Sequence, residues 1–184
     1  MKELDEHIQV LQNTVNEKQI NEVVDIIVKC FKSGNKVLFC GNGGSAADAQ
    51  HMAGEFVCKM ANVRAPLPSI ALSTDTSILT AIGNDFGFNK VFSRQVDALG
   101  QEGDVLIALS TSGSENIIEA VIAARLKGLC TIGFTGEKGR KRMRMNHNTV
   151  VVKSDNTARI QEAHEFLLHV ICQKVEDKYF GEAR

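Results

Sequence analysis

The sequence predicts an α/β fold with three layers (α/β/α), in which a five-stranded parallel sheet lies between two layers of helices and follows an N-terminal helical extension. The strands are predicted from short, almost uniformly apolar runs, as expected for strands buried on both faces. Segments with helical spacing separate these runs, and this alternation is typical of parallel sheets. The chain has 184 residues and no repeat, low-complexity tract or linker, so we expect a single domain over residues 1–184.

The predicted elements follow one another from the N-terminus. Apolar residues at helical spacing, from Ile8 to Phe31, predict a helical segment over residues 1–33 that ends near Ser33-Gly34. Five apolar runs then predict strands over Lys36–Cys40, Ser69–Leu72, Asp104–Leu109, Cys130–Phe134 and Thr149–Val152. Helices are predicted over Ser45–Met60, Ile78–Leu99, Asn116–Lys127 and Thr157–Tyr179.

Charge and composition exclude several classes of partner. The net charge of −1 argues against a general affinity for nucleic acid or anionic membranes. No apolar stretch reaches the roughly 20 residues needed to span a bilayer, and the first seven residues are too acidic and polar for a signal peptide. The five cysteines lack paired spacing, which predicts reduced core residues in a cytoplasmic protein. The basic segment Lys138–Arg144 is predicted to be a solvated loop.

A glycine-rich segment, Gly41-Asn42-Gly43-Gly44-Ser45, begins where the first predicted strand ends. Glycines let the backbone approach an anion closely, and the start of the next helix offers unpaired N–H groups. His51 and Glu55, four residues apart, share one face of that helix. The segment lacks the third glycine of a dinucleotide-binding fingerprint. It therefore predicts a phosphate cradle followed by two side chains able to transfer protons or bind a metal.

A serine-rich segment, Ser110-Thr111-Ser112-Gly113-Ser114, follows the third predicted strand. Four hydroxyls and a glycine at a strand-to-helix turn suit phosphate oxygens, although an ordinary helix N-cap would explain a single serine there. Ligands of open parallel sheets bind outside the carboxyl ends of the strands, at the point where the strand order reverses. If the first and third strands flank that point, the two loops face one another and share one phosphate.

These two loops resemble those of the sugar isomerase (SIS) domain family of phosphosugar-binding proteins, whose fold is flavodoxin-like. Three further segments extend the resemblance: Ala46–His51 with Glu55, Ala81–Phe88 and Thr157–His164. Together they are similar to the SIS members that convert sedoheptulose 7-phosphate to D-glycero-D-manno-heptose 7-phosphate for bacterial surface heptose. The resemblance covers about residues 20 to 180 and implies an aldose–ketose isomerase.

The resemblance also implies roles for single residues. Glu55 and His169 match the acid/base pair of the family. The positions that match substrate-binding residues are Asn42, Gly43, Gly44, Ser45, Glu55, Asn84, Asp85, Ser110, Thr111, Ser112, Ser114 and Gln161. The positions that match the zinc-binding residues of some members are His51, Glu55, Gln161 and His169, so zinc is the expected cofactor.

The sequence departs from the family pattern at three places. Lys59 stands where relatives can carry an arginine, so it keeps the charge and loses the bidentate guanidinium. The serine loop is one residue shorter than the usual Ser-Thr-Ser-Gly-Asn-Ser-x-Asn, which leaves the role of Ser114 open. Arg140 to His147 is basic where relatives usually have small or apolar residues.

The residue types fit the chemistry of an aldose–ketose isomerase. Such an enzyme moves one proton between adjacent carbons through an enediol and a second proton between the oxygens. Glu55 is the expected base at the carbons, and His169 is expected to open the sugar ring or carry the oxygen proton, because histidine titrates near neutral pH. Zinc would polarise the carbonyl. A zinc-bound carboxylate is a poorer base, so Glu55 must keep one oxygen free or alternate between the two roles.

Two other functions stay open. A non-catalytic SIS module that binds a phosphosugar or a protein partner would keep both loops without needing the acid/base pair, so the presence of Glu55 and His169 favours an enzyme. The second alternative is isomerisation of another ketose phosphate, because the sequence does not fix the number of sugar carbons.

The spacing of Gln161 and His169 predicts a site between subunits. The two residues lie eight positions apart on one helix, a rise of about 12 Å, so one metal ion would meet both side chains only with strained reach. The apolar content of the two terminal helical segments also exceeds what one sheet face can cover. We therefore expect the segment 1–33 to pack in an oligomer, which the family resemblance implies is a homotetramer.

Overall fold

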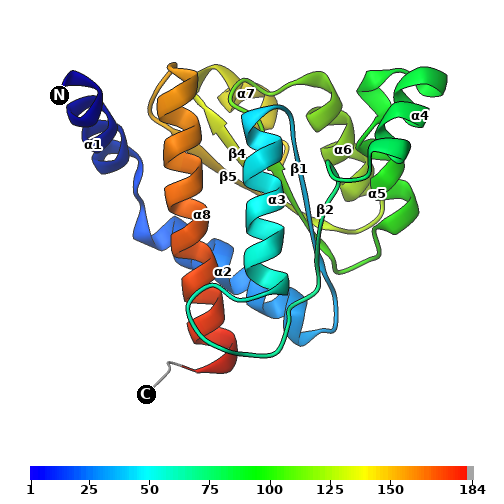
Figure 1. Ribbon diagram of the computed structural model, residues 1–184, viewed down its shortest axis with the longest axis horizontal. Coiled ribbons are helices and arrows are strands. Elements are labelled where there is room, and N and C mark those ends of the chain that lie inside the picture. The colour runs from blue at the N-terminus through cyan, green and yellow to red at the C-terminus, as the bar shows by residue number, and fades with distance from the viewer. Residues whose placement is uncertain (182–184) are drawn as a thin grey trace.

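The computed structural model describes residues 1–181 and contains the predicted five-stranded sheet (Figure 1). Its strands are β1 (Val37–Gly41), β2 (Ser69–Ala71), β3 (Val105–Leu109), β4 (Cys130–Gly136) and β5 (Asn148–Val152). All neighbouring strands pair in parallel, in the order β2-β1-β3-β4-β5. This is the flavodoxin-like order, which reverses between β1 and β3. The predicted α/β fold is confirmed.

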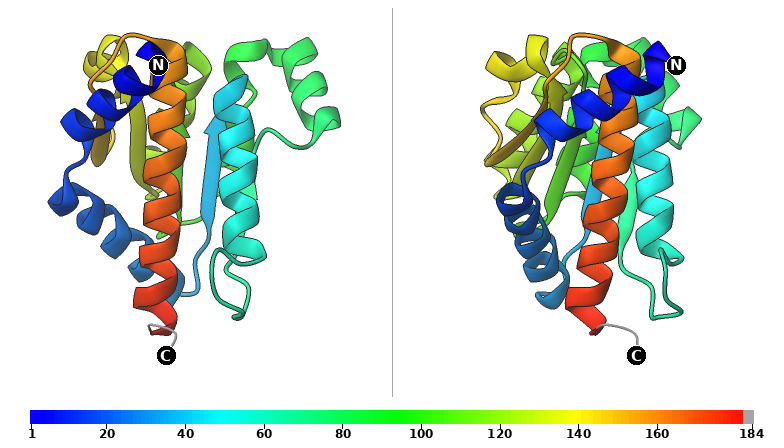
Figure 2. Two further views of the ribbon diagram at one scale, coloured as in Figure 1. Left: turned by 60° about the vertical axis from the view of Figure 1, so that its left-hand side comes forward. Right: turned by 90° about the vertical axis from the view of Figure 1, so that its left-hand side faces the viewer.

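Helices cover both faces of the sheet (Figures 1 and 2). The two terminal regions supply α1 (Lys2–Thr14), α2 (Glu17–Lys32) and α8 (Thr157–Phe180), and the middle of the chain supplies α3 (Gly44–Val57), α4 (Thr76–Phe86), α5 (Ser93–Leu99), α6 (Glu115–Leu126) and the short α7 (Arg140–Met143). One apolar core joins α2, α3 and α8 to the sheet. A second core joins the opposite face to α4, α5, α6 and α7.

The central strands are apolar throughout because both of their faces are buried. Successive side chains of a strand point to opposite faces. In β1, Phe39 therefore lies in the core under α2, α3 and α8, whereas its neighbours Leu38 and Cys40 lie in the core under α5 and α6. In β3, Ile107 and Leu106 divide in the same way. The uninterrupted apolar runs follow directly from this arrangement.

The N-terminal segment consists of two helices rather than one. Asn16 separates them, since its side-chain oxygen accepts a hydrogen bond from the backbone N–H of Gln19 (3.2 Å) and caps α2. Helix α2 buries Ile20 and Val23 in the core, while α1 lies against α8, where His7 Nδ1 is 2.8 Å from a Glu162 oxygen (Figure 2). The packing of residues 1–33 in an oligomer stays a prediction.

The prediction of one helix over Ile78–Leu99 was wrong. Helix α4 ends at Phe86, a turn of 3-10 helix (η1, Phe88–Lys90) follows, and α5 begins at Ser93. Gly87 separates α4 from η1 with φ of +86°, a conformation that glycine adopts without steric cost. The break leaves α4 projecting from the body, at the end of the molecule where the strands finish (Figure 2).

The basic segment Lys138–Arg144 was predicted to be a loop, and this was only partly right. Its positive side chains are exposed, but its residues lie in a 3-10 turn (η2, Glu137–Gly139) and in α7, which turns Met143 into the second core. All five cysteines are free, and three of them, Cys30, Cys40 and Cys172, are buried. Within residues 1–181, no helix has the length and apolarity needed to cross a bilayer.

Candidate active site

The glycine loop connects β1 to α3 at the carboxyl end of the sheet. A Cβ on Gly41 would lie 2.3 Å from the backbone oxygen of Ser45, so only glycine allows this close turn. Gly43 has φ of +56° and ψ of −121°, and as the N-cap of α3 it offers no capping side chain. Gly43 and Gly44 are exposed. The start of α3 is therefore open to an anion, as expected for a phosphate cradle.

The serine loop connects β3 to α6. The Ser110 hydroxyl oxygen accepts hydrogen bonds from the backbone N–H groups of Gly113 (3.0 Å) and Ser114 (2.9 Å), so this buried serine shapes its own loop. Ser114 is the N-cap of α6, but its side chain does not cap the helix. Within residues 1–181, the hydroxyls of Thr111 and Ser112 have no protein partner. These hydroxyls can donate to a ligand.

Paired amides join the two loops. Asn42 Nδ2 donates to Asn116 Oδ1 (2.8 Å), and Asn116 Nδ2 donates to Asn42 Oδ1 (2.9 Å). Because β1 and β3 are adjacent in the sheet, the loops that follow them face one another as predicted. Asn116 is buried, and the sequence analysis did not assign it a role. The arrangement places the glycines of one loop beside the hydroxyls of the other.

The predicted acid/base pair lies on α3 and α8. The His51 Nε2 atom is 3.3 Å from a Glu55 carboxylate oxygen on the same helix. The imidazole rings of His51 and His169 meet edge to face with 4.8 Å between their centres. The structure thus brings together three of the four residues that were predicted to bind zinc.

Glu165 joins this cluster, although the sequence analysis did not select it. Its carboxylate oxygen lies 3.0 Å from His51 Nδ1. Donor atoms of His51, Glu165 and His169 all lie within 4.8 Å of one another, a spacing that suits a shared metal ion. Glu55 lies outside this group of three, so two carboxylates approach His51, one at each ring nitrogen. Glu165 sits four residues before His169, and that spacing on α8 is the signal that could have revealed it.

Gln161 lies eight residues before His169 on α8. A Cβ on Gly44 would come 2.4 Å from Gln161 Nε2, so the amide of Gln161 packs against the glycine loop. Asn84 and Asp85 lie on the exposed helix α4, where the amide of Asn84 donates to Asp85 (2.7 Å). Ser45 is buried in the first turn of α3. Lys59 is exposed in the loop that follows α3.

Asp48 is a buried carboxylate that the sequence analysis missed. It lies on α3 one turn before His51, and within residues 1–181 its Oδ2 atom has no hydrogen-bond partner. Burial, with a smaller contribution from the nearby carboxylate of Glu165, raises the pKa of Asp48 to about 6, although His51 acts in the opposite direction. The middle of α3 therefore carries a carboxyl group that titrates close to neutral pH.

Comparison with known proteins first identifies the class of protein to which the chain belongs. A family model described as SIS domain matches residues 2–136, and together with the paired loops it defines a SIS domain protein. A curated phosphoheptose isomerase from Clostridium acetobutylicum is 50% identical over 166 residues, which is 90% of this chain and 85% of the relative. On these findings, the chain belongs to the phosphoheptose isomerase family.

Solved structures agree with this assignment. The phosphoheptose isomerase from Neisseria gonorrhoeae has a TM-score of 0.89 and 43% identity, with 96% of each chain covered. The phosphoheptose isomerase from Francisella tularensis has a TM-score of 0.91 and 37% identity, with coverage of 96% of this chain and 95% of that chain.

Proposed function

We propose that this protein is an aldose–ketose isomerase that converts sedoheptulose 7-phosphate to D-glycero-D-manno-heptose 7-phosphate. The observation that carries the proposal is the cluster of His51, Glu55 and His169. His51 and Glu55 lie on α3, which follows the glycine loop, and His169 lies on the neighbouring α8. Identity of about half of the residues to curated phosphoheptose isomerases supports it. The product is expected to feed the synthesis of bacterial surface heptose.

The proposed mechanism assigns the chemistry to Glu55 and His169. A Glu55 carboxylate oxygen takes a proton from the carbon beside the carbonyl and returns it to the neighbouring carbon through an enediol. A ring nitrogen of His169 moves the second proton between the two oxygens and opens the sugar ring. The glycine loop (Asn42, Gly43, Gly44, Ser45) and the serine loop (Ser110, Thr111, Ser112, Ser114) hold the phosphate, with Gln161, Asn84 and Asp85 as further substrate contacts.

We propose zinc as the cofactor. Imidazole and carboxylate are ordinary zinc ligands, and the donors of His51, Glu165 and His169 have the spacing for one ion. When bound, zinc would polarise the carbonyl and stabilise negative charge on oxygen. With Glu165 as the carboxylate ligand, Glu55 keeps both oxygens available as a base. The roles of Glu55 and Gln161 as ligands stay predictions, which a metal-bound structure would test.

We propose that the protein acts in the cytoplasm as a homotetramer. Five free cysteines support a reducing compartment. Apolar residues of α1 and α8 that remain exposed in the single chain, Leu4, Ile8 and Phe166, support contacts between subunits. In such an assembly, the helical segment 1–33 would contribute its exposed face to the interface.

The decisive experiment is to incubate the protein with sedoheptulose 7-phosphate and to follow the appearance of aldose by NMR, with and without a chelator. Pentulose and hexulose phosphates serve as parallel substrates. Turnover of the heptulose phosphate in preference to these supports the proposal. Tight binding without turnover by zinc-loaded protein would instead indicate a regulatory module, and faster turnover of a shorter sugar would reassign the substrate.

Subunit mixing tests whether the site is shared between chains. Glu55→Gln and His169→Gln proteins are expected to be inactive alone. Because His51 contacts both residues within one chain, their hybrids should stay inactive, whereas the site between subunits that the spacing of Gln161 and His169 predicts would restore part of the activity when subunits exchange. Recovery requires that the two residues serve one site from different chains. Verified hybrid oligomers that remain inactive would show that each site is built within one chain.

A further inference from the structure

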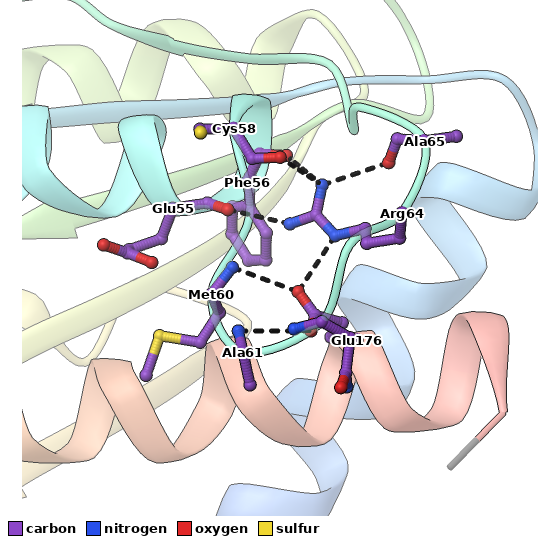
Figure 3. Close-up of polar contacts among 9 residues, drawn as sticks. Glu55, Phe56, Cys58, Met60, Ala61, Arg64, Ala65 and Glu176 are labelled. Atoms are coloured by element: carbon purple, nitrogen blue, oxygen red, sulfur yellow. Dashed lines mark hydrogen bonds and ion pairs between the residues drawn. The ribbon is translucent and has the colours of Figure 1, made fainter. Parts of the chain in front are cut away.

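A buried ion pair joins the loop after α3 to helix α8 (Figure 3). Arg64 Nε lies 2.9 Å from a carboxylate oxygen of Glu176, and only 4% and 2% of the two side chains are exposed. Neither residue belongs to the proposed catalytic, substrate-binding or metal-binding sets. Burial of two charges is costly unless other hydrogen bonds complete their environment, so the partners of each group show what the pair does.

Glu176 binds three consecutive backbone N–H groups of the loop. One carboxylate oxygen accepts from Met60 (3.1 Å), and the other accepts from Ala61 (3.2 Å) and Asn62 (2.6 Å). Burial alone would raise the pKa of Glu176, but these hydrogen bonds and that of Arg64 outweigh it and hold the pKa below its usual range. The carboxylate therefore stays ionised and fixes the loop to α8.

Arg64 caps the C-terminal end of α3. Its guanidinium donates to the backbone oxygens of Glu55 (2.7 Å) and Phe56 (2.7 Å), which belong to the last turn of the helix. Carbonyls of that turn have no partner inside the helix, and a cation suits the negative end of the helix dipole. The same guanidinium also reaches the oxygen of Ala65 (3.1 Å) within the loop.

The two ends of this network are close in sequence to the proposed acid/base pair. Arg64 binds the carbonyl of Glu55 itself, and Glu176 lies seven residues, about two helical turns, after His169 on the same face of α8. Between the His51–Glu165 contact and this network, α3 and α8 meet through adaptable contacts such as that between the sulfur atoms of Met52 and Cys172 (3.8 Å). The Arg64–Glu176 network differs from these contacts, because its planar, charged groups form hydrogen bonds of fixed direction.

We propose that the Arg64–Glu176 pair is a positioning device, which sets Glu55 on α3 relative to His169 on α8. The proposal rests on the proposed isomerase function. Displacement of a reacting group by about 1 Å can lower turnover by about 10²-fold even when the substitution lies outside the site. The proposed phosphate site lies at the opposite end of α3, so substrate binding should be nearly independent of the pair.

The test compares Glu176→Gln and Arg64→Lys with a matched control, Asp104→Asn. Asp104 is also buried, pairs with Lys36 (2.6 Å) and accepts from two backbone N–H groups, but it lies where β3 begins, opposite the loops. Assayed well below their unfolding temperatures, Glu176→Gln and Arg64→Lys should lower kcat by about tenfold or more and change KM by less than about twofold. Asp104→Asn should lose stability and keep kcat.

Several results would overturn the proposal. Unchanged kcat in both test variants, or an equal loss of kcat in Asp104→Asn, would mean that the pair only stabilises the fold. A change in KM with kcat intact would place its effect on substrate binding. If Glu176→Gln does not fold, Arg64→Lys carries the comparison alone, since lysine keeps the charge without the fork. A wild-type protein without isomerase activity would remove the proposed function itself, whereas an active wild type with fully active variants removes only the positioning role.

Discussion

The first turn of α3 has exposed glycines and no capping side chain, whereas the last turn of the same helix has its carbonyls bound by Arg64. At the first turn, the loop geometry depends on glycine conformations and on amides that link it to the serine loop. At the last turn, charged groups occupy the polar atoms of the backbone. Both ends belong to one helix of 14 residues that carries His51 and Glu55 between them.

On the proposed roles, the contrast separates binding at one end of the helix from chemistry toward the other. Buried polar groups in folded proteins are nearly always satisfied, so the exposed, uncapped start of α3 is available to a ligand. The end of α3 whose carbonyls are bound by Arg64 cannot bind a ligand in this way, and we propose that it positions Glu55 instead. We therefore expect substitutions at the open end to change affinity and substitutions toward the clamped end to change turnover.

The largest effect is expected for the acid/base pair. Glu55→Gln and His169→Gln should each lower kcat by about 10²-fold or more, the usual scale for such groups, and leave phosphate affinity nearly unchanged. Steady-state kinetics and calorimetric titration with inorganic phosphate measure the two quantities. Glu162→Gln, a carboxylate of α8 that pairs with His7, is the control. Wild-type kcat in both variants would mean that another pair carries the chemistry.

The next effect concerns the metal. Glu165→Gln should weaken zinc binding by about 10- to 100-fold, whether Glu165 is a ligand or orients His51 through its Nδ1 atom. Competition with a chromophoric chelator measures the affinity directly, without an assay of turnover. Glu162→Gln again provides the matched carboxylate. Equal affinity in the Glu165 variant and the wild type would exclude the residue from the site.

A substitution at the open end of α3 should act on affinity. Gly43→Ala places a side chain at φ of +56°, at a cost of about 1–3 kcal/mol, and should raise KM by about tenfold with little change in kcat. Gly34→Ala introduces comparable strain at φ of +77° in the turn between α2 and β1, away from the glycine and serine loops. The control should lose stability without a change in KM. A fall in kcat for Gly43→Ala would contradict the expectation that the start of α3 affects only substrate affinity.

The smallest effect is expected at Asp48, between the two ends. Its pKa in the folded protein, about 6, lies above the ordinary value of 3.8, so folding favours the protonated carboxyl. That contribution to stability is complete below about pH 4 and is lost as the pH rises through 6. Asp48→Asn, which resembles the protonated form, should match the wild type at pH 4 and exceed its unfolding temperature at pH 8. Allowing for solvent screening, we expect about 1 kcal/mol, or about 2–4 °C.

Thermal unfolding of chelator-treated protein across this pH range tests the sign. Equal unfolding temperatures of Asp48→Asn and the wild type at pH 8 would show that the carboxylate is compensated by its surroundings. A variant that is less stable at pH 8 would reverse the prediction and indicate that the ionised carboxylate has a stabilising partner.

The fold could be predicted because the central strands are buried on both faces, so that each consists of an uninterrupted run of apolar residues. The boundaries of β1 and β3 differ from prediction by a residue. The break at Gly87 was missed because the apolar spacing continues across it, so periodicity outweighed the single glycine. In the N-terminal segment, Asn16 was the signal of a second helix start, and the apolar pattern on both sides concealed it.

From the residues alone, the candidate site was predicted where its residues are neighbours in sequence, the family resemblance added the distant His169 and Gln161, and Glu165 was missed because only tertiary contacts bring it to the site. The two loops and the His51/Glu55 spacing can be read from short motifs. Glu165 meets His51 across 114 sequence positions, and Arg64 meets Glu176 across 112. Each is an ordinary charged residue within its own segment. Only the packing of α3 beside α8 gives them their partners.

The amide pair between Asn42 and Asn116 has a consequence for kinetics. Neither side chain carries a charge or exchanges a proton in the range where enzymes work, so the span between the glycine loop and the serine loop keeps its length from acidic to alkaline solution. Salt cannot screen it as it screens an ion pair. The pH–rate profile should therefore report the groups that transfer protons, unmixed with any change in the spacing of the two loops.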